Sequence, residues 1–422
     1  MTAAAPRPRV AFVSQPWNRF APPVQNGSIA IWTYEVARRL IATHDVAVYA
    51  RQGPDEAAHE RSADNLECHR VSLDADLRVL RLLRRGAGSR QPWFASRWSY
   101  RGFARAVARD LQRRGCDVVH VHNFSQFLPV LRRRLPRAKI VLHMHCEWLS
   151  QLNHRVIRRR LRAADLVLGC SDYIAATIRR AFPAVASRCY GLHNGADVAR
   201  FAPDPGDPAR EGTRSQILFV GRVSPEKGAH VLVEAFRRVL DAHPDATLRL
   251  VGPVGAPSRE FVLDLSDDPQ VRALEPHYRA DYATALTRDL PAAVAQRIEI
   301  TGPAPNTALV NDYRQAAVFA APSVWHEPFG IPLVEAMASG CPTIGTDGGG
   351  MPEIIEDGAT GYLVPRADPD ALARRLIELL GDAPRRAAMG HAARERAVAH
   401  FSWDRIAAEL ASRYEALARQ RS

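Results

Sequence analysis

The sequence predicts an α/β protein built from two doubly wound domains, each with a parallel sheet between layers of helices. Three observations support this fold class. Short apolar runs alternate with amphipathic helical patterns along most of the chain, which is typical of parallel sheets. A stretch rich in proline, aspartate and glycine interrupts this alternation at about 197–213, after which it restarts. The length of 422 residues allows each half to bury its own core.

Five apolar runs in the first half predict strands that are each followed by a helical pattern. They are Arg9 to Ser14, Asp45 to Ala50, Asp117 to His122, Lys139 to His145 and Asp165 to Cys170. The first helix is expected over Ile29 to Leu40. In the second half, Gln216 to Val220 and Pro342 to Thr346 are the clearest strands. After Pro365 only helices are expected, the last of them over Trp403 to Arg419.

These elements divide the chain into four segments. Residues 1–197 form the predicted N-terminal domain. Residues 198–213 form a linker, because domain boundaries fall in exposed chain rich in proline and glycine. Residues 214–398 form the predicted C-terminal domain, and residues 399–422 a terminal segment that contains the last helix.

The composition excludes several classes of protein. No apolar run reaches the roughly 18 residues that span a bilayer, and the N-terminus lacks the apolar core of a signal peptide. We therefore expect a cytoplasmic protein. Six cysteines are scattered without a Cys-x-x-Cys pair or a disulfide-dense pattern, so we expect them to be reduced and mostly buried.

The most informative segment is Trp-His-Glu-Pro-Phe-Gly-Ile-Pro-Leu-Val-Glu-Ala-Met-Ala-Ser-Gly, residues 325–340. Pro332 suits a first helical position, which predicts a helix that starts there. The N–H groups of Phe329 to Leu333 would then point out of the helix N-terminus and attract an anion such as phosphate. Glu335 is expected in the first turn, where a carboxylate also complements the helix dipole. Glu327, on the preceding loop, has no such structural explanation.

A second informative segment, residues 216–236, contains a short apolar strand, a turn and an amphipathic helix. The turn carries Arg222 and Lys227. Of the chain's 57 basic residues, only Lys139 and Lys227 are lysines, so a specific role explains Lys227 better than general surface charge. An ammonium and a guanidinium at the end of a parallel strand suit a diphosphate. A solvated strand–helix turn is the alternative.

Together these motifs resemble the C-terminal half of retaining family 4 glycosyltransferases, which are two-domain sugar-nucleotide enzymes. The resemblance rests on the Gly-Arg-x4-Lys-Gly turn that starts at Gly221, the Glu-x7-Glu pair at 327 and 335, and Gly-Gly-Met-Pro-Glu at 349–353. It extends to Asn-Gly-Ala-Asp at 194–197, where the family enters its interdomain linker. The resemblance covers essentially the whole chain, and four motifs in this order are specific although each alone is weak.

The resemblance implies the GT-B fold, in which two Rossmann-like domains face a cleft and a terminal helix crosses back onto the N-terminal domain. It implies transfer of a hexose-type sugar from a nucleoside-diphosphate sugar to a hydroxyl, with retention of anomeric configuration. At the matching positions, Glu327 would be catalytic and bind a donor-sugar hydroxyl, and Glu335 would bind the ribose. The remaining donor-binding positions in this half would be Arg222, Lys227, Phe329, Gly330 and Ile331.

The N-terminal half supplies the other candidate residues. Gly27 matches the first glycine of a Gly-Gly pair that the family places against donor phosphate or acceptor, and Ser28 replaces the second. His143 and His145 lie at the C-terminal end of a predicted strand, the edge where open α/β sheets bind ligands. The family has a functional histidine at this strand end. We therefore predict His145 as catalytic and His143 as structural, with a structural role for both as the alternative.

We predict no metal and no cofactor beyond the nucleotide sugar. His120 and His122 stand two apart on one strand, but no third ligand is nearby in sequence. Asp74 and Asp76 form an Asp-x-Asp pattern in a polar, arginine-flanked stretch. Members of the family need no metal, because helix termini and basic side chains stabilise the departing diphosphate.

The motifs do not fix the substrate pair. Base contacts are expected to be largely backbone, including the loop at Thr301 to Pro303, and we favour a UDP-sugar over GDP-mannose. The acceptor is expected to be a lipid-linked saccharide, a polysaccharide precursor or a small metabolite. A sugar-nucleotide epimerase on the same fold and a non-catalytic sugar-nucleotide-binding assembly protein are the alternatives. The absence of a Gly-x-Gly-x-x-Gly fingerprint disfavours an oxidoreductase.

Charge is divided unevenly between the halves. Residues 1–200 contain 33 basic and 15 acidic residues, a net charge of +18, and the remaining 222 residues carry −6. Arginine alternates with apolar residues at 78–90, 132–137 and 155–162, as in surfaces that bind anionic membranes. No nucleic-acid-binding module accompanies this charge, so we expect no nucleic-acid partner. Two interpretations remain: peripheral binding to the inner leaflet of a membrane, or a compositional bias toward arginine.

Overall fold

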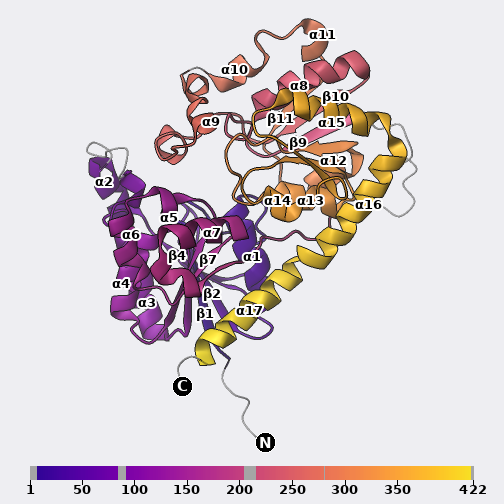
Figure 1. Ribbon diagram of the computed structural model, residues 1–422. Coiled ribbons are helices and arrows are strands. Elements are labelled where there is room, and N and C mark those ends of the chain that lie inside the picture. The colour runs from indigo at the N-terminus through magenta and orange to yellow at the C-terminus, as the bar shows by residue number, and fades with distance from the viewer. Residues whose placement is uncertain (1–6, 84–91, 204–214, 280, 420–422) are drawn as a thin grey trace, which may run out of the picture. The chain divides into compact units, whose positions relative to one another are not determined.

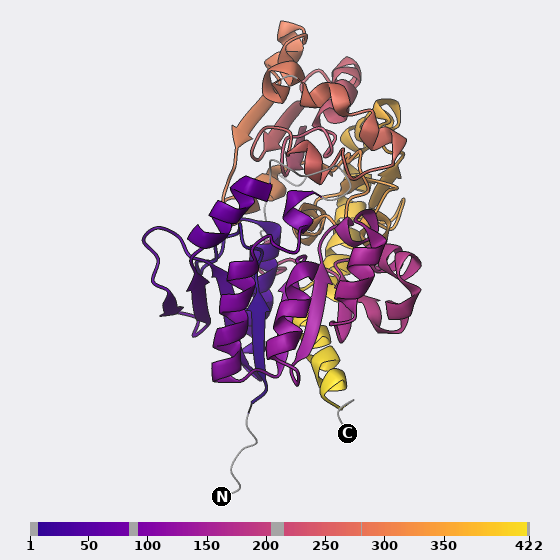
Figure 2. The same cartoon turned by 90° about the vertical axis from the view of Figure 1, so that its left-hand side faces the viewer.

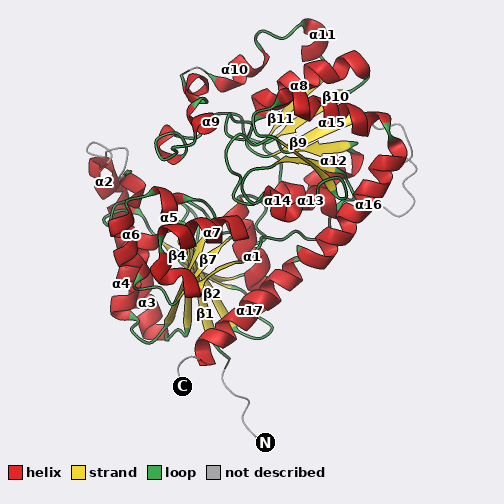
Figure 3. Ribbon diagram, in the orientation of Figure 1, coloured by secondary structure: helices red, strands yellow, loops and turns green. Residues whose placement is uncertain are grey.

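The computed structural model describes residues 7–83, 92–203, 215–279 and 281–419 (Figure 1). The chain folds into two compact units, one of residues 1–194 with 403–422 and one of residues 195–402. Each contains a sheet flanked by helices (Figure 3), so the predicted α/β fold class is confirmed. Of the predicted linker 198–213, residues 204–213 lie outside the described residues.

The described part of the first unit contains an eight-stranded sheet in the order β3-β4-β2-β1-β5-β6-β7-β8. The strands are β1 Arg9–Val13, β2 Asp45–Arg51, β3 His59–Arg61, β4 Glu67–Val71, β5 Val118–His122, β6 Lys139–Met144, β7 Leu166–Gly169 and β8 Cys189–Gly191. Neighbouring strands are parallel except β3, which pairs antiparallel with β4 at the edge. β3, β4 and β8 were not predicted from the sequence, because they are short and lack a continuous apolar run.

Helices cover both faces of this sheet (Figures 1 and 2). One face carries α1 (Ser28–Leu40) and α17 (Trp403–Arg419), which pack together over a core that includes Phe12, Trp32 and Leu410. The other carries α3 (Arg101–Arg114), α4 (Leu128–Arg134) and α6 (His154–Leu161). The remaining helices are α2 (Asp74–Leu83), α5 (Trp148–Gln151) and α7 (Asp172–Ala181). The last helix of the chain thus belongs to the first unit.

In the second unit, the described strands have the order β11-β10-β9-β12-β13-β14 and all neighbouring pairs are parallel. They are β9 Gln216–Val220, β10 Thr247–Val251, β11 Ile298–Gly302, β12 Val318–Ala320, β13 Thr343–Thr346 and β14 Gly361–Val364. The main helices are α8 (Ala229–Ala242), α12 (Leu309–Gln315), α13 (Ile331–Ala338), α15 (Pro369–Gly381) and α16 (Ala383–His400). Shorter helices are α9 (Pro269–Arg272), α10 (Tyr282–Thr287), α11 (Ala292–Ala295) and α14 (Met351–Ile354). Buried aliphatic and aromatic side chains of β9, β10, α8 and α15 form the core.

All six cysteines are free thiols, and Cys68, Cys170, Cys189 and Cys341 are buried, in agreement with the sequence analysis. Among the described helices, none is long and apolar enough to cross a membrane.

Candidate active site

Glu327 lies on the loop between β12 and α13, and its side chain is 10% exposed. Three donors reach the same oxygen, Oε2: Lys227 Nζ at 2.5 Å, Trp325 Nε1 at 3.0 Å and Ser323 Oγ at 3.1 Å. The second oxygen, Oε1, has no hydrogen bond to any described residue. The protein therefore fixes the carboxylate by one oxygen and leaves the other available to a ligand.

The environment of Glu327 keeps it ionised. Burial raises the pKa of this carboxyl, but Lys227 and the hydrogen bonds from Trp325 and Ser323 outweigh burial and hold the pKa below its usual value. The expectation that Glu327 has no structural partner is wrong: it is the counterion of Lys227. A change at either residue therefore alters the other.

Gly349 determines where the loop of Glu327 lies. It has φ +73°, and a Cβ at this position would come 2.1 Å from the Glu327 carbonyl oxygen and 2.6 Å from its nitrogen. The next amide, Gly350 N–H, donates to the same carbonyl at 2.8 Å. Only glycine therefore lets the Gly-Gly-Met turn approach the loop so closely.

We predict that Gly349→Ala displaces Glu327 and lowers the sugar transfer that the resemblance implies by about a hundredfold, the scale expected for a misplacement of about 1 Å. Gly358→Ala is the matched control, because Gly358 has φ +79° but a Cβ there meets nothing within 4 Å. Both variants carry the backbone strain of a positive φ, and only the first carries the collision. Similar turnover of the two purified variants would contradict this role.

The turn after β9 places Arg222 and Lys227 beside a buried carboxylate, Glu226. Arg222 Nη1 lies 3.5 Å from Glu226 Oε1, and the Ser224 hydroxyl donates to the same oxygen at 2.7 Å. Burial raises the pKa of Glu226, and its Oε2 has no hydrogen bond within the described structure. The Arg222 side chain is 47% exposed, so most of its donors remain available to a ligand. Glu226 was not predicted from the sequence, although its place between Arg222 and Lys227 in the chain was a signal for it.

The start of α13 offers fewer amides than predicted. The helix begins at Ile331 after Gly330, with Pro332 in its first turn as expected. Pro332 has no N–H, and the Leu333 N–H donates to the Gly330 carbonyl at 3.0 Å. The N–H groups of Gly330 and Ile331 have no hydrogen bond to a described residue, so they are the donors that point out of this N-terminus.

Glu335 does not lie in the first turn of α13, as the sequence analysis expected. It is 4% exposed, and both oxygens are bound: Asn306 Nδ2 donates to Oε1 at 2.6 Å and Tyr313 Oη to Oε2 at 2.8 Å. Burial raises its pKa to about 7, outweighing the two hydrogen bonds. The hydrogen bonds from Asn306 and Tyr313 thus fix the carboxylate of Glu335 inside the protein.

A third ionic group beside the Glu327 loop was also missed. Arg366 Nη1 donates to Asp268 Oδ2 at 2.6 Å and to the Val324 carbonyl at 2.9 Å, and His326 Nε2 lies 3.4 Å from the same carboxylate oxygen. Arg366 and Asp268 thereby hold the part of the loop that precedes Glu327, at Val324 and His326. Asp268 and Arg366 lie far apart in the sequence, so no local motif predicted that they pair.

In the first unit, Gly27 and Ser28 form the start of α1. Gly27 is the N-cap residue with φ +83°, and a Cβ there would meet only Ala30 at 3.9 Å. Ser28 is exposed, and its hydroxyl has no hydrogen bond to a described residue. The backbone at this helix N-terminus is therefore open to a ligand.

His145 follows β6 at the carboxyl edge of the same sheet. Its backbone N–H donates to Asn123 Oδ1 at 2.7 Å, and its ring Nε2 lies 3.0 Å from His122 Nδ1. Burial lowers its pKa to about 3, so the ring is neutral near pH 7. His143 is fully buried on the adjacent position of the same face, which agrees with a structural role.

Three buried histidines do lie together. His120, His122 and His143 each bring a ring nitrogen within 4.8 Å of the others. Hydrogen bonds already use these rings: His120 contacts Tyr414 Oη at 2.7 Å and His143 at 3.2 Å.

Asp76, in the Asp-x-Asp pattern, has a structural explanation, because it accepts the N–H groups of Gly102 and Phe103 at the start of α3.

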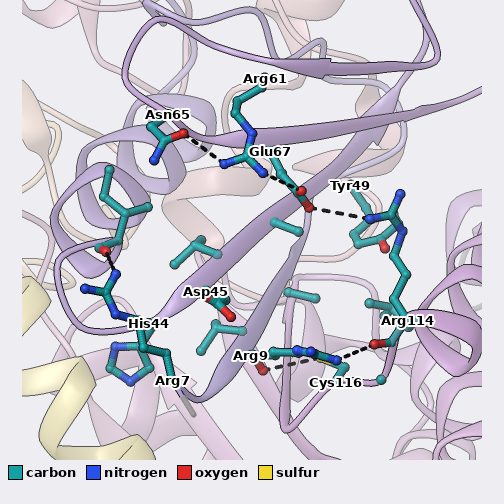
Figure 4. Close-up of a pocket in the computed structure, with 17 residues that line it drawn as sticks. Arg7, Arg9, His44, Asp45, Tyr49, Arg61, Asn65, Glu67, Arg114 and Cys116 are labelled. Atoms are coloured by element: carbon teal, nitrogen blue, oxygen red, sulfur yellow. Dashed lines mark hydrogen bonds and ion pairs between the residues drawn. The ribbon is translucent and has the colours of Figure 1, made fainter. Parts of the chain in front are cut away.

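A pocket of about 440 Å³ lies at the opposite edge of the first sheet (Figure 4). The amino ends of β1, β2 and β4 line it. Arginines that line the pocket interact with other residues of the protein. Arg61 pairs with Glu67 at 2.8 Å, and Arg9 donates to the Arg114 carbonyl at 2.6 Å. Open α/β sheets bind ligands at the carboxyl ends of their strands, so this pocket is not part of the candidate site.

Two parallel-sheet α/β units with these features define a GT-B glycosyltransferase. The chain belongs to the family 4 glycosyltransferases: residues 203–396 match the family model described as "Glycosyl transferases group 1", and residues 29–200 match "Glycosyltransferase Family 4". It is therefore an enzyme that acts on nucleotide sugars.

Two relatives illustrate the similarity. Spore coat protein SA of Bacillus subtilis (strain 168) is 28% identical over 411 residues, which cover 93% of this chain and 96% of the relative. The GDP-mannose-dependent alpha-(1-6)-phosphatidylinositol monomannoside mannosyltransferase of Mycobacterium tuberculosis (strain CDC 1551 / Oshkosh) is 32% identical over 297 residues, covering 66% of this chain and 70% of the relative.

Solved structures share the fold. Sucrose-phosphate synthase from Thermosynechococcus elongatus has a TM-score of 0.72 at 22% identity, covering 98% of this chain and 100% of that chain. Anabaena HepE in complex with UDP and glucose has a TM-score of 0.70 at 19% identity, covering 97% and 100%.

Proposed function

We propose that this enzyme transfers a hexose-type sugar from a nucleoside-diphosphate sugar to an acceptor hydroxyl with retention of anomeric configuration. The observation that carries the proposal is the carboxylate of Glu327, whose Oε2 is fixed by three donors while Oε1 has no described protein partner. Because Oε2 is fixed, Oε1 can accept a donor-sugar hydroxyl without reorganisation of the carboxylate. Such preorganisation is the condition for stabilising a transition state electrostatically.

The leaving diphosphate would be bound by Lys227, by Arg222 and by the amides of Gly330 and Ile331. These groups supply positive charge and N–H donors where negative charge grows as the sugar departs. We therefore propose that no metal is needed. Turnover that is unchanged by EDTA supports this, and turnover that requires an added divalent cation overturns it.

Glu335 would bind the ribose hydroxyls. Each of its oxygens accepts one protein hydrogen bond and retains a second lone pair for the nucleoside. In the first unit, Gly27 and Ser28 would contact donor phosphate or acceptor through the open start of α1. His145 would contact a hydroxyl of the sugar or acceptor.

We favour a UDP-sugar as donor. Anabaena HepE binds UDP and glucose, which supports this choice. The Mycobacterium tuberculosis relative is described as GDP-mannose-dependent, so GDP-mannose is the competing donor. The acceptor would be a lipid-linked saccharide, a polysaccharide precursor or a small metabolite.

A panel of nucleotide sugars tests the proposal through two readouts, the shift in melting temperature and the hydrolysis of the donor. The true donor raises the melting temperature because it binds only the folded state. NMR of the transferred product then gives its anomeric configuration. An inverted product overturns retention, and release of an epimerised nucleotide sugar overturns transfer in favour of the epimerase alternative.

For the membrane interaction, α6 is a poorer candidate than its sequence indicates. Of its three apolar residues, Ile157 and Leu161 are buried and Val156 is half-buried. Arg160 is also buried and donates to the Ala95 carbonyl at 2.7 Å. Two of the three apolar residues of this helix therefore do not face solvent, and a charge reversal at Arg160 would break a buried contact. Arg158 and Arg159 are exposed and supply charge alone.

Exposed apolar side chains lie instead on α2. Leu77 is 42% exposed and Leu82 is 69% exposed, and the exposed Arg78 and Arg81 stand beside them. Residues 84–90 of the same arginine cluster lie outside the described residues. Apolar side chains combined with arginines suit the interface of an anionic bilayer, so we propose α2 as the contact with the inner leaflet.

We predict that the protein sediments with anionic liposomes at low salt and not with neutral phosphatidylcholine liposomes. Leu77→Ser with Leu82→Ser should release it. Arg158→Glu with Arg159→Glu should weaken binding less, because an arginine contributes about 1 kcal/mol only when it lies near the bilayer surface, and α6 is not the proposed contact. If the wild-type protein stays in the supernatant, the excess of arginine is compositional.

A further inference from the structure

The environment of His145 fixes which of its two ring nitrogens carries the proton. His145 belongs to a short chain of hydrogen bonds that runs from its Nε2 to His122 and on to Thr33. His122 Nδ1 lies 3.0 Å from His145 Nε2, and His122 Nε2 lies 3.1 Å from Thr33 Oγ1. The chain ends at the Ile29 carbonyl, which is 2.7 Å from Thr33 Oγ1. All of these contacts lie within the first unit.

The direction of the chain follows from the Ile29 carbonyl, which has no proton to give. At 2.7 Å, the hydroxyl of Thr33 must donate its single proton to that carbonyl. Thr33 Oγ1 then has only lone pairs for His122, so His122 donates from Nε2. Burial lowers the pKa of His122 well below its usual value, so the ring is neutral and carries one proton. Its Nδ1 is therefore unprotonated.

The protonation of His122 determines that of His145. Because His122 Nδ1 is unprotonated, a hydrogen bond at 3.0 Å requires His145 to donate from Nε2. The neutral ring of His145 then has a lone pair at Nδ1. This nitrogen has no hydrogen bond to any described residue. A substrate hydroxyl that reaches it meets an acceptor and not a donor.

We propose that Thr33 and His122 are positioning residues that hold His145 as the Nε2–H tautomer, so that its Nδ1 accepts a hydrogen bond from a substrate hydroxyl. This inference rests on the proposed function for the identity of the substrate, but the tautomer itself is a property of the free protein. Neither Thr33 nor His122 touches substrate in this scheme. Both act through His145.

A second histidine chain on the same face provides an internal control. His120 lies on β5 with His122, is equally buried, and hydrogen-bonds to Tyr414 at 2.7 Å and His143 at 3.2 Å. Both His120 and His122 pack against Phe12 and Trp32. His120 has no hydrogen bond to His145, so its loss should disturb packing without changing the tautomer of His145.

The direct test is nitrogen NMR of the full-length protein labelled with ¹⁵N-histidine, with His145 assigned by its loss in His145→Gln. We expect one neutral form of His145, protonated at Nε2 and unprotonated at Nδ1, that does not titrate between pH 6 and 8, since burial holds its pKa at about 3. Protonation at Nδ1 in the wild-type protein overturns the proposal.

Two pairs of variants separate positioning from packing. Thr33→Val removes the acceptor of His122 and should allow a second tautomer of His145 to appear, whereas Thr33→Ser keeps the hydroxyl and should restore the single form. His122→Phe keeps an aromatic ring and should have the same effect as Thr33→Val, and His120→Phe should leave the tautomer unchanged. If either valine or phenylalanine variant fails to fold, the other still decides. An unchanged tautomer in a folded Thr33→Val or His122→Phe overturns the proposal.

Kinetics supply the second readout. Thr33→Val should lower kcat for sugar transfer at least about tenfold with little change in KM for the donor, and Thr33→Ser should recover most of the loss. A loss confined to KM would indicate a structural role and overturn the positioning role. If the wild-type protein transfers no sugar, the proposed function fails while the NMR result still decides the tautomer.

Discussion

Glu327→Gln should lower sugar transfer by about a hundredfold or more, which corresponds to roughly 3 kcal/mol of transition-state stabilisation. The reason lies in the three donors that converge on Oε2. In the variant, the amide oxygen would take the place of Oε2, because only an oxygen can accept from Lys227, Trp325 and Ser323. The amide NH₂ would then replace Oε1. The atom that faces the donor sugar would donate where the carboxylate accepts.

The measurement is kcat with the donor identified by the nucleotide-sugar panel, together with the melting temperature of each variant. Glu299→Gln is a matched control, since Glu299 belongs to the same unit, pairs with Arg249 and is 61% exposed. It should lose neither turnover nor stability, because exposed ion pairs contribute little. Near wild-type turnover in a folded Glu327→Gln would remove Glu327 from the mechanism.

Sequence patterns predicted the fold because apolar periodicity reports burial directly. The five strands expected in the first half correspond to β1, β2, β5, β6 and β7, and the helix expected over Trp403 to Arg419 is α17. The edge strand β3 escaped prediction because all three of its residues are exposed, so it carries no apolar pattern. The local motifs likewise placed a helix after Glu327, at α13.

The interactions inside the site were harder to predict, because they join residues far apart in sequence. Lys227 and Glu327 were each expected to face substrate, yet they pair with each other at 2.5 Å. Asp268 and Arg366 form a similar pair from separate loops. Short-range spacing cannot reveal such partners, since they meet only when the strands of the sheet are assembled. The register between β5 and β6, which aligns His122 with His143, likewise could not be predicted from short-range spacing.

The position at which α13 begins explains the error at Glu335. This residue was expected in the first turn, where a carboxylate would stand beside a bound phosphate. In the structure it follows that turn and points to Asn306 and Tyr313. Glu335 is the fifth residue of α13, and its side chain is buried inside the unit instead of standing beside the helix N-terminus. A sequence motif gives the order of the residues along the helix, but it does not show which of them are buried.

Lys227→Ala should weaken binding of the free nucleoside diphosphate by about ten- to a hundredfold, the loss of a hydrogen bond to a charged group worth about 1.5–3 kcal/mol. Lys227 Nζ pairs with Glu327 at 2.5 Å and its side chain is 26% exposed, so it is accessible to a phosphate. Glu327→Gln should bind the diphosphate as well as the wild type or more tightly. That product carries no sugar for Glu327 to hold, and the substitution frees the ammonium from its counterion.

Calorimetry with the diphosphate distinguishes these roles. Lys139→Ala is the control, because Lys139 is the only other lysine and begins β6 in the first unit. Lys227→Ala also leaves Glu327 buried without its counterion, a loss of stability separate from ligand binding. The double variant Lys227→Ala with Glu327→Gln removes that unpaired charge, so a binding defect that persists in it belongs to the lost ammonium. Equal losses of affinity in the two single variants would contradict separate roles and would mean that Lys227 binds the diphosphate only when Glu327 positions it.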